Sequence, residues 1–216
     1  MIVPSMTYEE VFRELAQDRD NVARWYGHRS REYRRKALKA RAFPITWTAD
    51  YLSPRKNRYI ICTQCTRRDY IRYHALTAVA LRKEEKGYSV YLTYIGSNTM
   101  IKPTVLLPHV FDRYAERAGV NKTGTELIAH FVSKVSGGTI LDDEHLAGRS
   151  VRYKGRDHMF IAISEGVLLG DKEHGIFVAR TFITYDMATG LQREQFEEAK
   201  GKLFSVEDEI RYVRNI

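Results

Sequence analysis

Residues Tyr73–Ile95 read YHALTAVALRKEEKGYSVYLTYI. Two stretches rich in β-branched and aromatic residues, Tyr73–Arg82 and Tyr88–Ile95, flank the charged segment Lys83–Gly87, and Gly87 can adopt the positive φ that such a turn needs. The pattern predicts an antiparallel β-hairpin. Arg58–Thr66 (RYIICTQCT) has the same β-forming content, so we expect three antiparallel strands in this part of the chain.

The sequence on the N-terminal side of these strands is helical in pattern. Thr7 and Glu10 form a capping-box signature at the start of a helix over Thr7–Gln17. A second, longer helix is predicted over Asp20–Arg41, where Gly27 would kink or divide it, and Pro44 lies just beyond its end.

The sequence on the C-terminal side alternates between helices and strands. Pro108 and Gly119 bound one predicted helix, Pro108–Ala118, and a second begins at Thr123 or Thr125 and runs to Val135. Four strands and a helix then follow: Ser150–Tyr153, His158–Ser164, Val167–Gly170, Gly175–Tyr185 and Leu191–Lys200. The fold class is therefore α+β, with antiparallel sheet(s) and a helical, basic N-terminal layer. We divide it into residues 1–102, which are helical plus three-stranded, and residues 103–216, and expect both in one compact unit.

The charge is distributed unevenly. The chain has a formal net charge of +8, and Met1–His74 contains 16 Lys and Arg against 8 Asp and Glu, so this segment alone accounts for the excess. A one-sided basic excess is typical of proteins with a polyanionic partner. The sequence has no apolar run long enough to span a bilayer and no secretory pattern at its start, so we expect a cytoplasmic protein without a membrane partner.

The predicted helix over Asp20–Arg41 carries the main candidate binding residues. Arg24, His28, Arg31, Arg35 and Lys39 are spaced three or four residues apart and so share one helical face. With the neighbouring basic residues they form what we call the basic row: Arg24, His28, Arg31, Arg34, Arg35, Lys39 and Arg41.

Cations one helical turn apart can neutralise successive phosphates, and the interleaved Trp25, Tyr26 and Tyr33 offer stacking surfaces. The row therefore indicates nucleic acid, RNA more than DNA. A solvated helix face and a site for an acidic protein partner remain the alternatives.

The helix beginning at Pro108 carries the candidate catalytic residues. His109, Arg113 and Arg117 are four residues apart and lie along one side of that helix. A neutral imidazole can act as a general base, and arginines on the same face can hold a phosphate. Together they suit metal-independent RNA cleavage through the 2′-hydroxyl. The alternative is a helix that packs Val110, Phe111 and Tyr114 inward and turns its charges to water.

Several pieces between His109 and Tyr185 carry a family resemblance: the helix with His109, Arg113, Glu116 and Arg117, then Arg152–Tyr153, the strand His158–Ser164, and Arg180–Tyr185 (RTFITY). This segment resembles the toxin-type ribonuclease domains grouped with barnase, colicins and RelE, which include versions borne by phages and mobile elements. The resemblance implies an endoribonuclease in which His109 is the base and Arg113 and Arg117 hold the phosphate. It adds Thr181 or Tyr185 as a phosphate-binding or acid group.

Cofactor and metal motifs are absent from the sequence. Cys62 and Cys65 are a lone C-x2-C pair, and an odd offset on a regular strand turns the two side chains to opposite sides. His130, His145, His158 and His174 lack metal-ligand spacing. We therefore expect no metal and no cofactor. The leading interpretation is an RNA-binding protein, and the alternative is a non-catalytic nucleic-acid-binding or protein-binding module.

Overall fold

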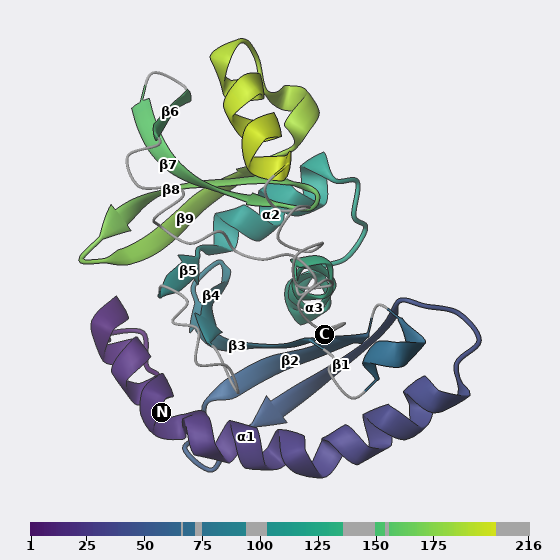
Figure 1. The fold of residues 1–216 in the computed structure, drawn as a ribbon. Coiled ribbons are helices and arrows are strands. Elements are labelled where there is room, and N and C mark those ends of the chain that lie inside the picture. The colour runs from purple at the N-terminus through teal and green to yellow at the C-terminus, as the bar shows by residue number, and fades with distance from the viewer. Residues whose placement is uncertain (66, 72–74, 94–102, 136–149, 154–155, 202–216) are drawn as a thin grey trace.

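The predicted hairpin lies within a nine-stranded sheet (Figure 1). The computed structural model describes residues 1–65, 67–71, 75–93, 103–135, 150–153 and 156–201. Strands β3 (Ala75–Glu84) and β4 (Gly87–Thr93) pair antiparallel from Ala78↔Thr93 to Glu84↔Gly87. Gly87 has a φ of 118°, the conformation that the turn was predicted to need.

Two further strands extend this half of the sheet. Strand β2 (Arg58–Cys65) pairs antiparallel with β3, which confirms the three predicted strands. Strand β1 (Ile45–Leu52) adds a fourth strand at the edge that the sequence analysis did not predict. Its side chains alternate between half-buried and exposed, because only one of its faces is covered.

The second half of the sheet is another antiparallel run, built from β6 (Ser150–Tyr153), β7 (Arg156–Ile163), β8 (Gly166–Glu173) and β9 (Ile176–Ile183). Strand β5 (Thr104–Leu106) joins the halves, since it pairs antiparallel with β4 and parallel with β9. The strand order is β1-β2-β3-β4-β5-β9-β8-β7-β6, so one sheet crosses the division drawn at residue 102.

One face of the first half-sheet is covered by α1 (Tyr8–Lys39), a single helix of 32 residues (Figure 1). The capping box of Thr7 and Glu10 is formed as predicted. The helix passes through Gly27 without dividing, and an added Cβ there would meet nothing within 4 Å. Contacts with the sheet lie on both sides of Gly27, from Val11 to Ala37, and they hold the chain helical across the glycine.

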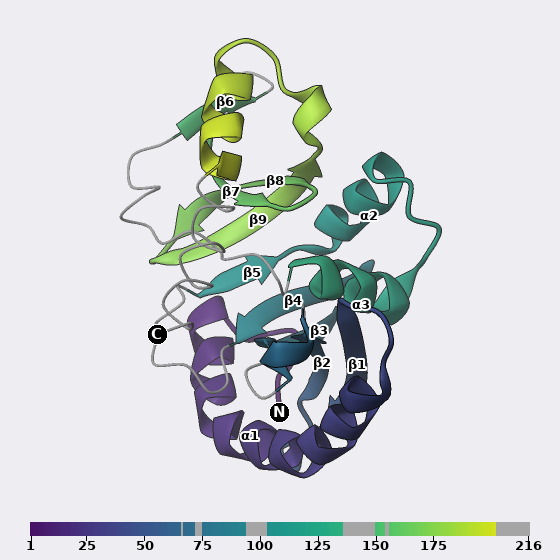
Figure 2. The ribbon, with the colours of Figure 1, turned by 45° about the vertical axis from the view of Figure 1, so that its right-hand side comes forward.

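The alternation of side chains along the strands separates the two cores. Tyr59, Ile61 and Tyr91 point to α1, where they pack with Val11 and Leu15. The intervening residues point to the other face, which is covered by α2 (Pro108–Arg117) and α3 (Gly124–Val135). That second core contains Ile60, Cys62, Val79, Leu81, Val110, Phe111 and Phe131. Helices α1 and α2 therefore lie on opposite faces of the sheet (Figure 2).

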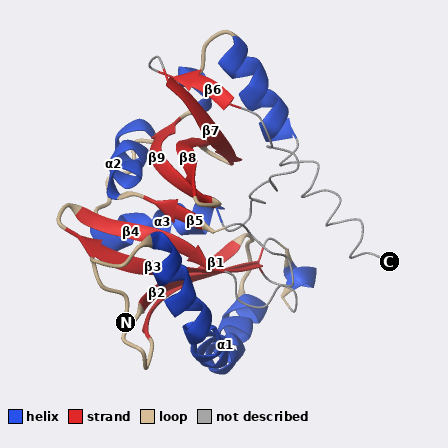
Figure 3. Cartoon of the chain, turned by 90° about the vertical axis from the view of Figure 1, so that its left-hand side faces the viewer, coloured by secondary structure: helices blue, strands red, loops and turns tan. Residues whose placement is uncertain are grey.

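The C-terminal part of the described chain covers the second half of the sheet. After the short 3-10 helix η2 (Tyr185–Met187), residues 191–201 are helical, and the Phe196 ring meets that of Phe160 on β7 edge-on at 5.1 Å. Figure 3 shows this helix beside β6 and β7, at the other end of the molecule from α1. The predicted α+β class, with an antiparallel sheet and a basic helical N-terminal layer, is confirmed.

The sequence also predicts a loop over Leu141–Arg149 and a last helix near Ser205, and both segments lie outside the described residues. Among the described helices, none combines the length and the apolar character needed to cross a bilayer.

A buried polar contact fixes the N-terminal half of α1 to the β1–β2 turn. The Asp18 carboxylate is fully buried and accepts hydrogen bonds from Ser53 Oγ at 2.5 Å, Asn57 Nδ2 at 3.0 Å and the Tyr59 hydroxyl at 3.0 Å. Burial raises the pKa of Asp18, but these hydrogen bonds outweigh it and leave the pKa below its ordinary value. The carboxylate therefore remains charged and holds the helix in one register on the sheet.

Glu14 strengthens this attachment one turn earlier. Its carboxylate accepts from Arg55 Nε at 2.9 Å and Nη2 at 2.7 Å, and from the N-terminal ammonium at 2.6 Å. These donors, with Arg55 the largest influence, lower the pKa of Glu14 to about 2. Glu14 and Asp18 are thus both engaged in holding α1 to the sheet.

Candidate nucleic-acid interface

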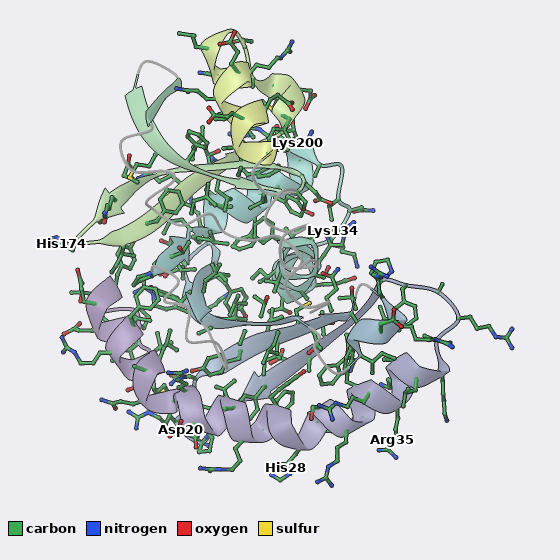
Figure 4. All side chains as sticks on the ribbon, in the orientation of Figure 1. Asp20, His28, Arg35, Lys134, His174 and Lys200 are labelled. Carbon is green, nitrogen blue, oxygen red and sulfur yellow. The ribbon has the colours of Figure 1, made fainter. Side chains whose placement is uncertain are left out.

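The basic row lies on the outer side of α1. Val22, Tyr33 and Ala37 turn into the sheet, so the opposite side of these helical turns faces solvent. The row is exposed in full: Arg24, His28, Arg31, Arg34, Arg35, Lys39 and Arg41. Figure 4 shows His28 and Arg35 pointing away from the sheet. The predicted row therefore exists as one continuous strip of side chains.

Few acidic groups accompany the row. Residues 21–41 contain eight Lys and Arg and one acid, Glu32. Glu32 pairs with two cations beside the row, Arg29 at 3.3 Å and Lys36 at 3.1 Å, and Lys36 is the main cause of its lowered pKa. Within the described part of the chain, no carboxylate forms an ion pair with any of the seven row residues. Their charge is available to a partner.

The aromatic residues of this helix do not serve as stacking surfaces in the way that the sequence suggested. Tyr33 is fully buried. Trp25 is half-buried and stacks on Tyr51 of β1 with ring centroids 4.8 Å apart, and Tyr26 is likewise half-buried. These rings belong to the helix–sheet contact, because the helical period that exposes the row turns them inward.

A second segment brings cations to the C-terminal end of α1. The short helix η1 (Arg68–Tyr70) follows β2, and Arg68 Nη2 donates to the carbonyl of Ala40 at 3.0 Å. A guanidinium at this position satisfies a free carbonyl and complements the negative end of the helix dipole. Arg67 and Arg68 are both exposed, but Arg67 pairs with Asp69 at 3.9 Å, so Arg68 is the cation that this segment adds at the helix end.

The catalytic candidates on α2 have a different environment. His109 is exposed, and its Nε2 accepts a hydrogen bond from Arg113 Nε at 3.1 Å. Arg113 also pairs with Glu116 at 2.5 Å and lowers the pKa of that carboxyl group. His109 and Arg113 are thus brought together, but the positive charge of Arg113 is balanced within the helix.

The other three candidates, Arg117, Tyr185 and Thr181, lie on or near β9. The polar groups of Arg117 and Tyr185 bind backbone carbonyls. Arg117 donates through Nη1 to the backbone carbonyl of Phe182. The Tyr185 hydroxyl donates to the carbonyl of Ile163 at 2.7 Å, and burial raises the pKa of Tyr185. Thr181 is half-buried on β9, opposite Leu169 in the pairing register. Arg117 therefore links α2 to β9, and Tyr185 links the segment after β9 to β7.

The two basic helices do not share one surface. The basic row faces outward from one side of the sheet and α2 packs on the other (Figure 2). The arginines of α2 therefore add nothing to the strip on α1. A single ligand would have to reach around the sheet edge to touch both.

The sequence analysis missed a polar cluster between α2 and α3. The buried Tyr114 hydroxyl lies 2.5 Å from Glu165 Oε2 and 3.2 Å from His130 Nδ1. The sequence separations of 16 and 51 residues conceal these contacts. The one available signal was Tyr114 itself, because a tyrosine on the apolar side of a helix needs a hydrogen-bond partner once it is buried.

The two cysteines are packing residues. Cys62 belongs to the core under α2 and α3, whereas Cys65 packs with Tyr33 near the end of α1. They lie on opposite faces of β2, as the odd offset predicted. Burial raises the pKa of the Cys65 thiol. The part of the chain that the structure describes contains no cluster of three metal-ligating side chains.

Comparison with known proteins yields no relative. No family model, no curated protein and no solved structure matches this chain.

Proposed function

We propose that the protein binds nucleic acid through the basic row of α1, with RNA preferred to DNA. The observation that carries the proposal is the exposure of seven cationic or titratable side chains, six on α1 and Arg41 just past its C-cap, without a carboxylate partner among the described residues. Such a strip supplies the sequence-independent part of nucleic-acid affinity, because each cation that meets a phosphate releases condensed counterions.

The dimensions of the row suit a phosphate backbone. Residues four apart on a helix rise by about 6 Å, so Arg31, Arg35 and Lys39 present a charge at each turn. The exposed Arg68 adds a cation at the helix end, where it binds the Ala40 carbonyl. The buried aromatic rings leave phosphate contact, rather than base stacking, as the dominant interaction.

The salt dependence of binding tests this proposal. We expect the logarithm of the affinity for a labelled single-stranded RNA to fall linearly with log salt, with a slope of about −0.7 for each phosphate contacted. A DNA of the same sequence, single- or double-stranded, measures the preference for RNA. A slope near zero, or absence of binding at low salt, would refute the proposal and leave an acidic protein as the partner of the row.

A second candidate function is the metal-independent endoribonuclease that the resemblance implied. The hydrogen bond from Arg113 to His109 favours it, because Nε2 must be unprotonated to accept, as a general base is before reaction. The test is cleavage of labelled RNA in the presence of a chelator. His109→Ala should abolish cleavage and leave RNA affinity nearly unchanged.

His28→Ala is the matched control, since His28 is an exposed histidine within the basic row. It should weaken binding slightly and leave the cleavage rate of bound RNA intact. Equal cleavage by the wild type and His109→Ala would exclude the catalytic role of His109.

A further inference from the structure

The cluster around Tyr114 joins three elements on the side of the sheet opposite the basic row. Tyr114 lies on α2, His130 on α3, and Glu165 in the tight turn between β7 and β8. Lys134, one turn after His130, lies 3.5 Å from Glu165 Oε1. We call these four residues the His130 cluster.

The single hydroxyl proton of Tyr114 determines which ring nitrogen of His130 carries a hydrogen. Burial and the hydrogen bond to Glu165 raise the pKa of Tyr114, so this hydroxyl keeps its proton at ordinary pH. The proton is donated to the Glu165 carboxylate at 2.5 Å. The tyrosine oxygen can then only accept from His130 Nδ1, which lies 3.2 Å away and must carry a hydrogen.

Packing holds this arrangement in place. The Tyr114 ring meets Phe131 and Phe182 edge-on, at centroid distances of 5.0 and 5.3 Å. Gly166 follows Glu165, and a Cβ there would lie 2.7 Å from the Phe182 ring and closer still to the Ile183 carbonyl. The turn that carries Glu165 therefore fits against β9 only because residue 166 is glycine.

An imidazole held by Nδ1–H presents its other nitrogen as an acceptor. In a neutral histidine, one ring nitrogen donates and the other accepts, and the hydrogen bond made by the first fixes the role of the second. His130 is half-buried rather than enclosed, and no hydrogen bond to its Nε2 occurs among the residues that the structure describes. Lys134 lies on the same side of α3, about one turn away, and is half exposed.

We propose that Glu165 and Tyr114 hold His130 as its Nδ1–H tautomer and so create a second ligand site, where Nε2 accepts a proton-bearing oxygen. Lys134 attracts the negative charge of the ligand, because its half-exposed ammonium pairs with Glu165 only at 3.5 Å. The ligand class is an anion that keeps a hydroxyl proton at about pH 8, such as hydrogen phosphate. This site is independent of the basic row and of RNA binding.

The tautomer is measured directly by the nitrogen chemical shifts and long-range couplings of the His130 ring at about pH 8, where neutral imidazole predominates in ordinary histidines. We expect Nδ1–H in the wild type and conversion to Nε2–H in Tyr114→Phe. Tyr185→Phe is the control, because its hydroxyl donates to the Ile163 carbonyl and contacts no histidine in the described structure. A wild-type Nε2–H tautomer would overturn the proposal.

A comparison of inorganic phosphate with sulfate tests the ligand part of the proposal separately from the tautomer. At about pH 8 hydrogen phosphate keeps one proton and sulfate has none, so only phosphate can donate to Nε2. We expect the affinity for phosphate, measured by titrating the shift of the His130 ring signals, to be at least about five-fold higher than the affinity for sulfate. Tyr114→Phe should remove that difference. Equal affinity for the two anions, or no response to phosphate, would refute the site. Unchanged RNA binding in Tyr114→Phe keeps this outcome separate from the proposed function.

Discussion

Helices α1 and α2 both carry cations at intervals of three or four residues, yet the structure treats the two sets differently. On α1 the basic row faces solvent without described acidic partners. On α2, Arg113 pairs with Glu116 and Arg117 binds the Phe182 carbonyl. The same spacing in the sequence therefore gives an exposed strip without described carboxylate partners in one helix and paired side chains in the other.

The difference arises from what surrounds each helix. Helix α1 lies along the outside of the sheet, and the row on its outer face is exposed in the described part of the chain. Helix α2 is short and packs beside β9, which brings backbone carbonyls within reach of its side chains. Spacing identifies a common face, but the neighbouring elements decide whether the charges on that face are free.

The largest expected effect is reversal of charge on the row. Arg31→Glu, Arg35→Glu and Lys39→Glu combined should lower RNA affinity by on the order of 1,000-fold at physiological salt, because phosphate contacts are lost and repulsion replaces them. Fluorescence anisotropy of labelled RNA measures the change.

Two arginines of the same helix provide the matched control. Arg13 and Arg19 are exposed but lie in the acidic half of α1. Arg13→Glu with Arg19→Glu should lower the affinity by less than about ten-fold, through net charge alone. If this pair costs as much as the triple variant, binding depends on total charge and the row has no special part.

Most of the fold was predictable from local patterns. The β-rich stretches on both sides of Lys83–Gly87 predicted a hairpin that the structure confirms. The capping box at Thr7 is also formed, but the two helices predicted over Thr7–Gln17 and Asp20–Arg41 are one helix. The exposed basic row also followed from helical periodicity. Strand β1 was missed, because its alternation of Trp and Tyr with Thr and Asp begins directly after the helix end and Pro44.

The pairing between distant residues was not predictable in the same way. Nothing local indicates that β5 joins β9 in parallel, or that Tyr114 meets Glu165 from 51 residues away. Such contacts depend on how sheet and helices assemble, and a single sequence shows periodicity without showing partners. The inward orientation of Tyr33 was available from periodicity, since it occupies the face opposite the row, whereas Trp25 lies at the side of the row and is half-buried.

Acid should loosen the attachment of α1 before it affects the row. The folded pKa of Glu14, about 2, lies below its unbound value of 4.5, so its contribution to stability is complete above about pH 4.5 and is lost as the pH falls towards 2. Allowing for partial solvent screening, we expect about 1–2 kcal/mol less stability at about pH 3 than at pH 7 from this group. Urea unfolding of wild type and Glu14→Gln measures it. A pH dependence that the variant retains in full would assign the effect to other carboxylates.

Replacing an arginine should lower the stability of the protein more when the arginine is on α2 than when it belongs to the basic row on α1. Arg117→Ala removes a charged donor from the Phe182 carbonyl and should cost about 1–2 kcal/mol in the free energy of unfolding. Arg35→Ala removes an exposed side chain with no described partner and should change stability by less than about 0.5 kcal/mol. Chemical denaturation measures both. Equal costs would mean that the row also supports the fold.

The smallest expected effect comes from removing the ion pair on α2. It tests whether the cations of α2 can bind RNA as the basic row is proposed to do. Glu116→Gln releases Arg113 from its ion pair without removing any cation. Because α2 lies on the opposite face of the sheet, the released charge acts on RNA only at long range through salt-screened water, and we expect the affinity to rise no more than about two-fold. An increase of ten-fold or more, together with a steeper salt dependence, would show that RNA reaches both faces. The nuclease interpretation of His109 and Arg113 would then gain the substrate contact that it needs.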